Sequence, residues 1–208
     1  MRTRVLALAL IAAGLSAATP AVASPVKCKG GDITIDDRIF PEPEFSTQFL
    51  RFDEFECAIA LLERTFPNKL EVTTIGSSED GRPLYNLLVT NESVTAPKRD
   101  LFISSSIHGD EPAGREGAVR FIEDILDARF LGDEEWVKRV LDEFVINFVF
   151  PNPDGWVAGD VLGTEGAGAL PTRTNGAGVD LNRELPVQGW VDVPKNVTPE
   201  GRALKSLF

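Results

Sequence analysis

The chain has 208 residues, 43% of them hydrophobic and 25% charged, which are the proportions of an ordinary globular protein of about one domain. Its formal net charge of −11 argues against nucleic acid and anionic membranes as partners, because both would repel an acidic surface. Nothing in the composition indicates an oligomeric state.

Residues 1–23 have the pattern of a secretory signal peptide. Two arginines precede the apolar run 5–18, and small residues at 21–23 provide a cleavage site. The apolar run is short for a membrane span, although an uncleaved anchor is the alternative interpretation. We expect cleavage after Ala23, which would make the protein secreted or periplasmic and leave it without a membrane segment.

Residues 24–48 are polar and contain prolines, and we expect them to form an extended lead-in to a domain over residues 49–208. Cys28 and Cys57 are the two cysteines of the chain. They could pair in an oxidising compartment, and two unpaired thiols are equally compatible with the sequence.

The first predicted elements are a helix and a hairpin. Asp53 is expected to cap a helix whose apolar residues recur at helical spacing as far as Phe66, before Pro67 ends it. Two strands, 70–75 and 84–89, flank a turn with Asp-Gly at its centre, which predicts a β-hairpin.

A βαβ unit is predicted next. An apolar run from Leu101 is expected to form a strand that ends at His108, and Pro112 marks the start of a helix with a one-sided apolar stripe. A short helix around 136–144 and a nearly continuous apolar strand, 145–150, follow. Strand, helices and strand predict two parallel strands and an α/β fold.

His108 and Glu111 are predicted to lie in a tight turn at the carboxyl end of the first of these strands, where open α/β sheets place their ligand sites. An imidazole and a carboxylate three residues apart can face one point, and zinc accepts both kinds of ligand. A solvated turn is the simpler alternative. His108 is the only histidine in the chain, which strengthens the metal interpretation.

Residues 151–198 show no long periodic segment and are interpreted as a loop, after which a helix opens at Pro199. This loop carries Arg173 and the neighbours Asn182 and Arg183. Arginine binds carboxylates through two parallel hydrogen bonds, and asparagine adds a directional donor. A Lewis-acid metal beside such a carboxylate clamp favours hydrolysis of a bond close to a free carboxylate, whereas plain surface charge is the alternative for either arginine alone.

Three motifs carry a family resemblance: His-Gly-Asp-Glu at 108–111, Asn-Pro-Asp-Gly at 152–155 and Gly-Val-Asp-Leu-Asn-Arg at 178–183. Their order and spacing resemble the zinc carboxypeptidases, the carboxypeptidase A-like metallopeptidases, and the bacterial branch is the most similar. Residues 75–84 are similar to the early hairpin of that family. The resemblance implies an α/β fold with a mixed, largely parallel central sheet flanked by helices. It also implies that residues 49–208 form the N-terminal part of the catalytic domain, so that the fold is incomplete at its C-terminus.

The resemblance also implies roles. His108 and Glu111 would be two of three protein ligands of Zn²⁺, and Arg173 would be the catalytic residue that polarises the scissile carbonyl. Asn182 and Arg183 would bind the terminal carboxylate of the substrate. The implied function is a secreted zinc metallocarboxypeptidase that hydrolyses the C-terminal bond of peptides with a free carboxylate, using a metal-activated water.

Two more aspartates receive structural roles by the same resemblance. Asp180 would orient His108 from the second shell of the metal, and Asp154 would stabilise a turn.

The chain also departs from the family pattern. The third zinc ligand and the general base of the family fall beyond Phe208, so the 208-residue chain by itself could be inactive. Glu184 replaces the usual asparagine and is expected to place a negative charge beside the clamp. A non-catalytic peptide-binding relative and a zinc deacylase of N-acyl amino acids are therefore alternative functions. The preference for a substrate side chain cannot be read from these residues.

Overall fold

The computed structural model describes residues 49–161, 173–185 and 197–207. The predicted signal peptide and lead-in, with Cys28, lie outside these ranges. Cys57 is disulfide-bonded. None of the helices described is long and apolar enough to cross a membrane.

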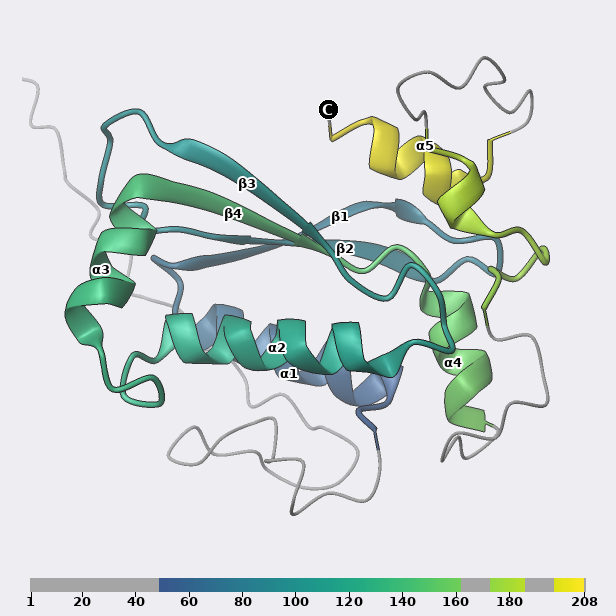
Figure 1. Cartoon of the computed structure of the whole chain (residues 1–208), viewed down its shortest axis with the longest axis horizontal. Coiled ribbons are helices and arrows are strands. Elements are labelled where there is room, and N and C mark those ends of the chain that lie inside the picture. Colours follow the sequence, from purple (N-terminus) through teal and green to yellow (C-terminus); the bar gives the residue numbers. More distant parts are fainter. Residues whose placement is uncertain (1–48, 162–172, 186–196, 208) are drawn as a thin grey trace, which may run out of the picture.

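Four strands form one mixed sheet in the order β1-β2-β4-β3 (Figure 1). They are β1 (Leu70–Ser77), β2 (Pro83–Val89), β3 (Arg99–Ser104) and β4 (Phe144–Val149). β1 and β2 form the predicted antiparallel hairpin, and β2 also pairs with β4 in antiparallel fashion. β3 and β4 are parallel, as the βαβ prediction requires. The predicted α/β fold with a mixed, helix-flanked sheet is thus confirmed, and parallel pairing within the described ranges is confined to β3 and β4.

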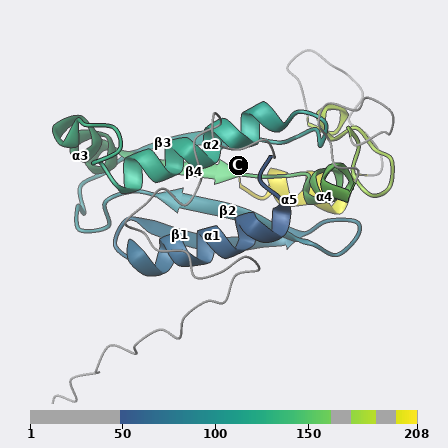
Figure 2. The ribbon, with the colours of Figure 1, turned by 90° about the horizontal axis from the view of Figure 1, so that it is seen from below.

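The helices cover both faces and both ends of the sheet (Figures 1 and 2). α1 (Phe52–Thr65) and α2 (Pro112–Leu126) pack on one face, and α5 (Pro199–Lys205) contacts β1 on the other. α3 (Glu134–Glu143) lies at one end of the molecule, while α4 (Pro153–Val161) lies at the opposite end, near α5.

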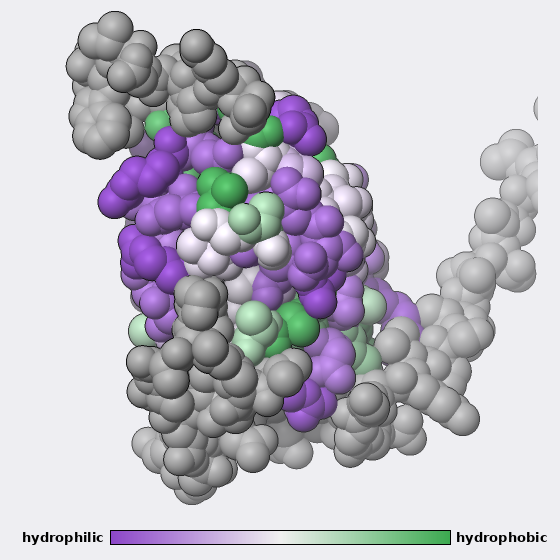
Figure 3. Space-filling model, turned by 90° about the vertical axis from the view of Figure 1, so that its right-hand side faces the viewer, coloured by the Kyte–Doolittle hydropathy of each residue, from purple (hydrophilic) through white to green (hydrophobic). Residues whose placement is uncertain are grey.

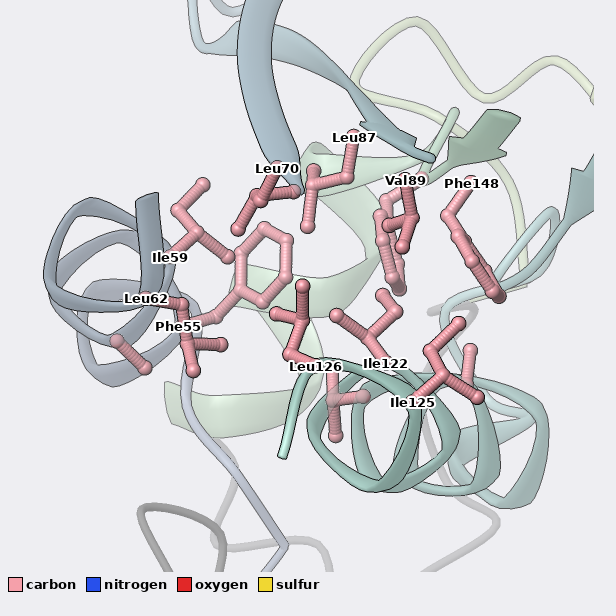
Figure 4. Close-up of a cluster of buried hydrophobic side chains, with 14 of the residues drawn as sticks. Phe55, Ile59, Leu62, Leu70, Leu87, Val89, Ile122, Ile125, Leu126 and Phe148 are labelled. Atoms are coloured by element: carbon pink, nitrogen blue, oxygen red, sulfur yellow. The ribbon is translucent and has the colours of Figure 1, made fainter. Parts of the chain in front are cut away.

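The main core fills the space between the sheet and the pair α1 and α2 (Figure 4). Each helix contributes one apolar face, because residues three and four positions apart lie on the same side. The predicted stripe of α2 is buried at all five positions, namely Ala118, Val119, Ile122, Ile125 and Leu126. From the sheet, Leu70, Leu87, Val89 and Phe148 meet the two helices.

Two predicted boundaries were wrong. Arg51, not Asp53, occupies the N-cap of α1, and its backbone N–H donates to Glu54 Oε2 at 2.9 Å. β3 ends at Ser104 rather than continuing to His108. The reason is a change of backbone direction, since Ser106 adopts a φ of +61°, which takes the chain out of the sheet.

The interpretation of residues 151–161 as loop was also wrong, because α4 begins at Pro153. Asn152 Oδ1 accepts a hydrogen bond from the Gly155 N–H at 2.8 Å, and Pro153 takes the first helical position, where its missing N–H costs nothing. The helix is short and its main buried anchor is Trp156, which is fully buried, so the sequence shows little apolar periodicity here.

We expect the core between α2 and the sheet to dominate stability. Ile122→Ala should lower the free energy of unfolding by about 2–5 kcal/mol, since the side chain is 1% exposed and its loss leaves a cavity. Leu131, which is 40% exposed, provides the control, and Leu131→Ala should change the free energy by no more than about 0.5 kcal/mol. Urea denaturation measures both, and equal effects would contradict this assignment of the core.

Candidate metal centre and arginine loop

His108 and Glu111 lie in the loop between β3 and α2, and their side chains meet. Nδ1 of His108 is 3.0 Å from Glu111 Oε1, and Nε2 on the other side of the ring is 3.0 Å from Asp180 Oδ1. His108 is 4% exposed, whereas the Glu111 side chain is 56% exposed. The imidazole is therefore held from within the protein and has one carboxylate neighbour at the surface.

Asp180 determines which ring nitrogen of His108 is available. Asp180 and Glu111 can both only accept, and both lie 3.0 Å from a ring nitrogen. Asp180 is the less exposed of the two, with 23% of its side chain accessible against 56% for Glu111, and this favours the tautomer with the proton on Nε2. Burial raises the pKa of the Asp180 carboxyl, but hydrogen bonds from His108 and from the Asn182 N–H outweigh this effect and hold the pKa below its usual range. Asp180 is thus a charged acceptor, and the lone pair of Nδ1 faces Glu111.

This arrangement fits a cation. A lone pair on Nδ1 and a carboxylate oxygen 3.0 Å apart repel each other unless a proton or a metal ion lies between them. Imidazole nitrogen and carboxylate oxygen are both zinc ligands, and a carboxylate on the opposite ring nitrogen is the usual second-shell partner of a zinc-bound histidine. Within residues 49–161, 173–185 and 197–207, no group of three or more His, Cys, Asp or Glu side chains is arranged to hold a metal. Zinc sites have three or four protein ligands, of which His108 and Glu111 would be two.

Two buried side chains hold the backbone on either side of His108. Asn152 Nδ2 donates to the Ile107 carbonyl, and Arg115 Nη1 donates to the Gly109 carbonyl, both at 3.1 Å. Arg115 is 1% exposed, and its guanidinium lies over the ring of Trp156, 4.8 Å from the centroid. No sequence pattern pointed to Arg115, whereas Asn-Pro at a helix start is a signal that could have located α4 and its cap.

Arg173 comes from a distant part of the chain and contacts the pair formed by His108 and Glu111, which is called the metal pair below. Its Nη1 is 3.3 Å from Glu111 Oε1, and its Nε is 3.3 Å from Asp180 Oδ2. The side chain is 41% exposed, so the guanidinium retains access to solvent and to a ligand. The structure thus brings His108, Glu111 and Arg173 together around Asp180.

The segment that carries Arg173, residues 173–180, is called the arginine loop below. It is anchored by buried carboxylates. Asp154, near the start of α4, accepts hydrogen bonds from Ser78 Oγ and Arg82 Nη1, both at 2.6 Å. Its other oxygen accepts from the Gly176 N–H at 3.3 Å. Asp154 therefore links the hairpin turn to the arginine loop, and it does so from a helix rather than from the predicted turn.

Glu200 of α5 makes a similar link and is completely buried. Its Oε1 accepts from the Glu79 N–H at 3.0 Å, and its Oε2 accepts from Asn175 Nδ2 at 3.1 Å. The hairpin turn, the arginine loop and α5 thus share one set of charge-assisted hydrogen bonds.

Glu184 does not lie beside the clamp as expected. It is 3% exposed and accepts a hydrogen bond from the Thr198 N–H at 2.8 Å and another from the Thr198 hydroxyl, at the start of α5. Its charge is thus directed to a helix N-terminus, where negative charge is stabilised. The residue anchors α5, and the prediction of a repulsive charge at the clamp is corrected.

Asn182 and Arg183 lie in a 3₁₀ turn, η2 (Leu181–Arg183), directly after Asp180. Both side chains are exposed, and Arg183 Nη1 donates to the Asn182 carbonyl at 3.2 Å. They are linked to the metal pair through a backbone group, because the Asn182 N–H donates to Asp180 Oδ1, the same oxygen that contacts His108. On the face that carries α4 and α5, the described residues are mostly hydrophilic, with scattered hydrophobic residues between them (Figure 3). The role of this pair in substrate binding stays a prediction.

Comparisons with known proteins agree on one family. The family described as zinc carboxypeptidase matches residues 56–203. Carboxypeptidase E of Caenorhabditis elegans is 36% identical over 151 residues, which cover 66% of this chain and 31% of that protein.

Two solved structures share the fold. The crystal structure of thrombin activatable fibrinolysis inhibitor is similar with a TM-score of 0.62 at 20% identity, over 80% of this chain and 46% of that one. The metallo-carboxypeptidase from Burkholderia cenocepacia is similar with a TM-score of 0.58 at 24% identity, over 74% of this chain and 36% of that one.

The chain spans 12% to 31% of the length of the curated relatives that it matches. The loop between β3 and α2, residues 105–111, carries His108 and Glu111 and is called the metal loop below. The family match covers both the metal loop and the arginine loop. The motifs, the mixed α/β fold and the family match together show that this chain belongs to the zinc carboxypeptidase family.

Proposed function

We propose that the protein is a secreted or periplasmic zinc metallocarboxypeptidase that removes the C-terminal residue of peptides. The observation that supports this most directly is the meeting of His108, Glu111 and Arg173 from two loops that are far apart in sequence. A metal pair beside an arginine suits hydrolysis of a carbonyl compound, and the family is one of hydrolases. The secreted location rests on the signal-peptide pattern of residues 1–23.

His108 and Glu111 would hold the Zn²⁺, with Asp180 keeping the histidine ring oriented. Zinc, when bound, supplies Lewis acidity and lowers the pKa of a bound water. The partly exposed guanidinium of Arg173 would donate to the substrate carbonyl oxygen as that oxygen gains negative charge. It is already positioned by two carboxylates, which reduces the reorganisation needed during the reaction.

Asn182 and Arg183 would bind the free carboxylate of the substrate. Both side chains are exposed and lie two and three residues after Asp180, so they are available to a ligand near the metal pair. An arginine fork matches the geometry of a carboxylate. The burial of Glu184 supports this proposal, because its carboxylate is engaged with Thr198 rather than with the clamp.

A peptide-binding protein without catalysis is the second candidate. A measurement of bound zinc distinguishes it from the peptidase, since a binder of peptide C-termini has no need of a metal. A deacylase of N-acyl amino acids would use the same metal pair and clamp, and a substrate panel of peptides against N-acyl amino acids distinguishes the two enzymes.

The metal assignment predicts a charge-specific loss of zinc binding. In the protein expressed from its complete gene, Glu111→Gln should weaken zinc binding by more than about 100-fold, because loss of a ligand exceeds the effect of losing an outer-shell partner. Glu143→Gln is the matched control, since Glu143 is also exposed and paired with an arginine, Arg99 at 2.7 Å. Competition with a chromophoric chelator measures both affinities. Unchanged zinc binding in Glu111→Gln would remove this residue from the metal site.

A second prediction concerns Asp180. Asp180→Asn should lower the zinc affinity by about 10–100-fold without unfolding the protein, because the His108 ring loses its charged acceptor. Asp100→Asn on β3, an exposed position, is the control. If zinc titrations of the two variants coincide, Asp180 has no influence on the metal ligand.

The clamp predicts an effect on substrate binding rather than on the chemical step. Arg183→Ala should raise KM for free-acid peptides several-fold and leave kcat nearly unchanged, as expected for loss of uniform binding. Arg139→Ala on α3, at the opposite end of the molecule, serves as the control. Steady-state kinetics on matched free-acid and amidated peptides measure the effect, and equal KM values for the two substrate forms in the parent protein would contradict the clamp.

A further inference from the structure

Asn152 connects the two loops of the candidate site and has no role in the proposed chemistry. It is 1% exposed and stands where β4 ends and α4 begins. Its Nδ2 donates to the Ile107 carbonyl at 3.1 Å and to the Arg173 carbonyl at 3.2 Å. Its Oδ1 accepts from the Gly155 N–H at 2.8 Å, so each polar atom of the carboxamide is in use.

Both acceptors belong to the backbone of the site. The Ile107 carbonyl is part of the peptide that leads into His108, and the Arg173 carbonyl belongs to the residue that would polarise the substrate. The two donors come from one rigid amide group, while the acceptors lie 45 and 21 residues away in sequence. A shift of either loop relative to the other would therefore break one of the two hydrogen bonds that this amide group donates.

The metal loop needs such a restraint. Ser106 has a φ of +61° and is the one non-glycine residue with positive φ among the residues that the structure describes. A side chain in that region of φ is strained and persists only where the surrounding structure enforces it. Asn152 holds the Ile107 carbonyl, one residue further on, and Arg115 holds the Gly109 carbonyl just beyond His108.

We propose that Asn152 is a positioning residue that fixes the His108 loop relative to Arg173 and so sets how the metal ligand and the guanidinium face one substrate. The catalytic part of this inference rests on the proposed function, whereas the geometric part does not. Asparagine suits this position because it supplies two donors and one acceptor. An aspartate there keeps the acceptor for α4 but turns an oxygen toward two carbonyls.

The test compares Asn152→Asp with Asn86→Asp. Asn86 on β2 is also buried, at 5% exposure, and its Nδ2 donates to Asn147 Oδ1 at 3.0 Å across the sheet. The two substitutions make the same chemical change in buried positions, one joined to the site and one not. Thermal unfolding of both variants, compared with the parent, separates a loss of stability from a local effect.

The first measurement needs no activity. His108 is the only histidine of the 208-residue chain, so a ¹⁵N-labelled sample without a histidine tag shows one imidazole. Asn152→Asp should shift and broaden the ¹⁵N signals of the His108 ring and weaken the signal pattern of the tautomer protonated on Nε2. Asn86→Asp should leave these signals as in the parent. Asn152→Ser is a second variant that keeps a helix cap and is used if the aspartate variant does not fold, and it should show the same shift.

The second measurement uses the protein expressed from its complete gene. Asn152→Asp should lower kcat by about 10-fold or more, because a small misplacement of reacting groups is costly, and KM should change little since the clamp at Arg183 is untouched. Ring signals identical to the parent in both Asn152 variants would overturn the proposal, as would equal kinetic losses in Asn152→Asp and Asn86→Asp. Shifted ring signals in a protein without peptidase activity would support the positioning role and reject the proposed function.

Discussion

The contact between the Asp180 carboxylate and Nε2 of His108 is the interaction on which the site depends. It favours the tautomer that leaves a lone pair on Nδ1, and it places that lone pair opposite Glu111 at 3.0 Å. Without it, the ring could donate from Nδ1 to Glu111 and would present no lone pair on the side that faces Glu111. The same carboxylate positions Arg173 through Nε and accepts from the Asn182 N–H, so one side chain organises the metal pair, the arginine and the proposed clamp.

The fold places Asp180 there through buried polar contacts rather than through the apolar core. β3 and β4 run parallel and deliver their following loops to the same end of the sheet, which brings His108 next to Asn152. The arginine loop has little apolar content of its own. It is held by Asp154 and Glu200, whose buried carboxylates accept hydrogen bonds from backbone and side-chain donors. Such groups must be satisfied when buried, which makes their partners specific and the loop conformation defined.

α4 illustrates how a short element can support a site. Trp156 packs against Phe55 and Phe150 in the core, and Arg115 lies over its ring while donating to the Gly109 carbonyl. The hydrophobic core and the metal loop are therefore joined through one indole and one guanidinium. A change in the core near Trp156 would be transmitted to the loop that carries His108, since the intervening groups are closely packed.

The sequence by itself determined the elements with strong periodicity and the identity of the chemical groups. The hairpin, the α2 stripe, the parallel pair and the family could be predicted, because spacing and turn chemistry are local properties and the motifs are ordered along the chain. The site residues His108, Glu111 and Arg173 could be named from the same motifs, although their roles stay predictions.

Only the tertiary structure decided that Glu184 is buried at the start of α5 and that Asn152 joins the loops that carry His108 and Arg173. These outcomes depend on hydrogen bonds between segments many residues apart. No local pattern encodes the partner of a buried polar group, because that partner is chosen when the chain packs.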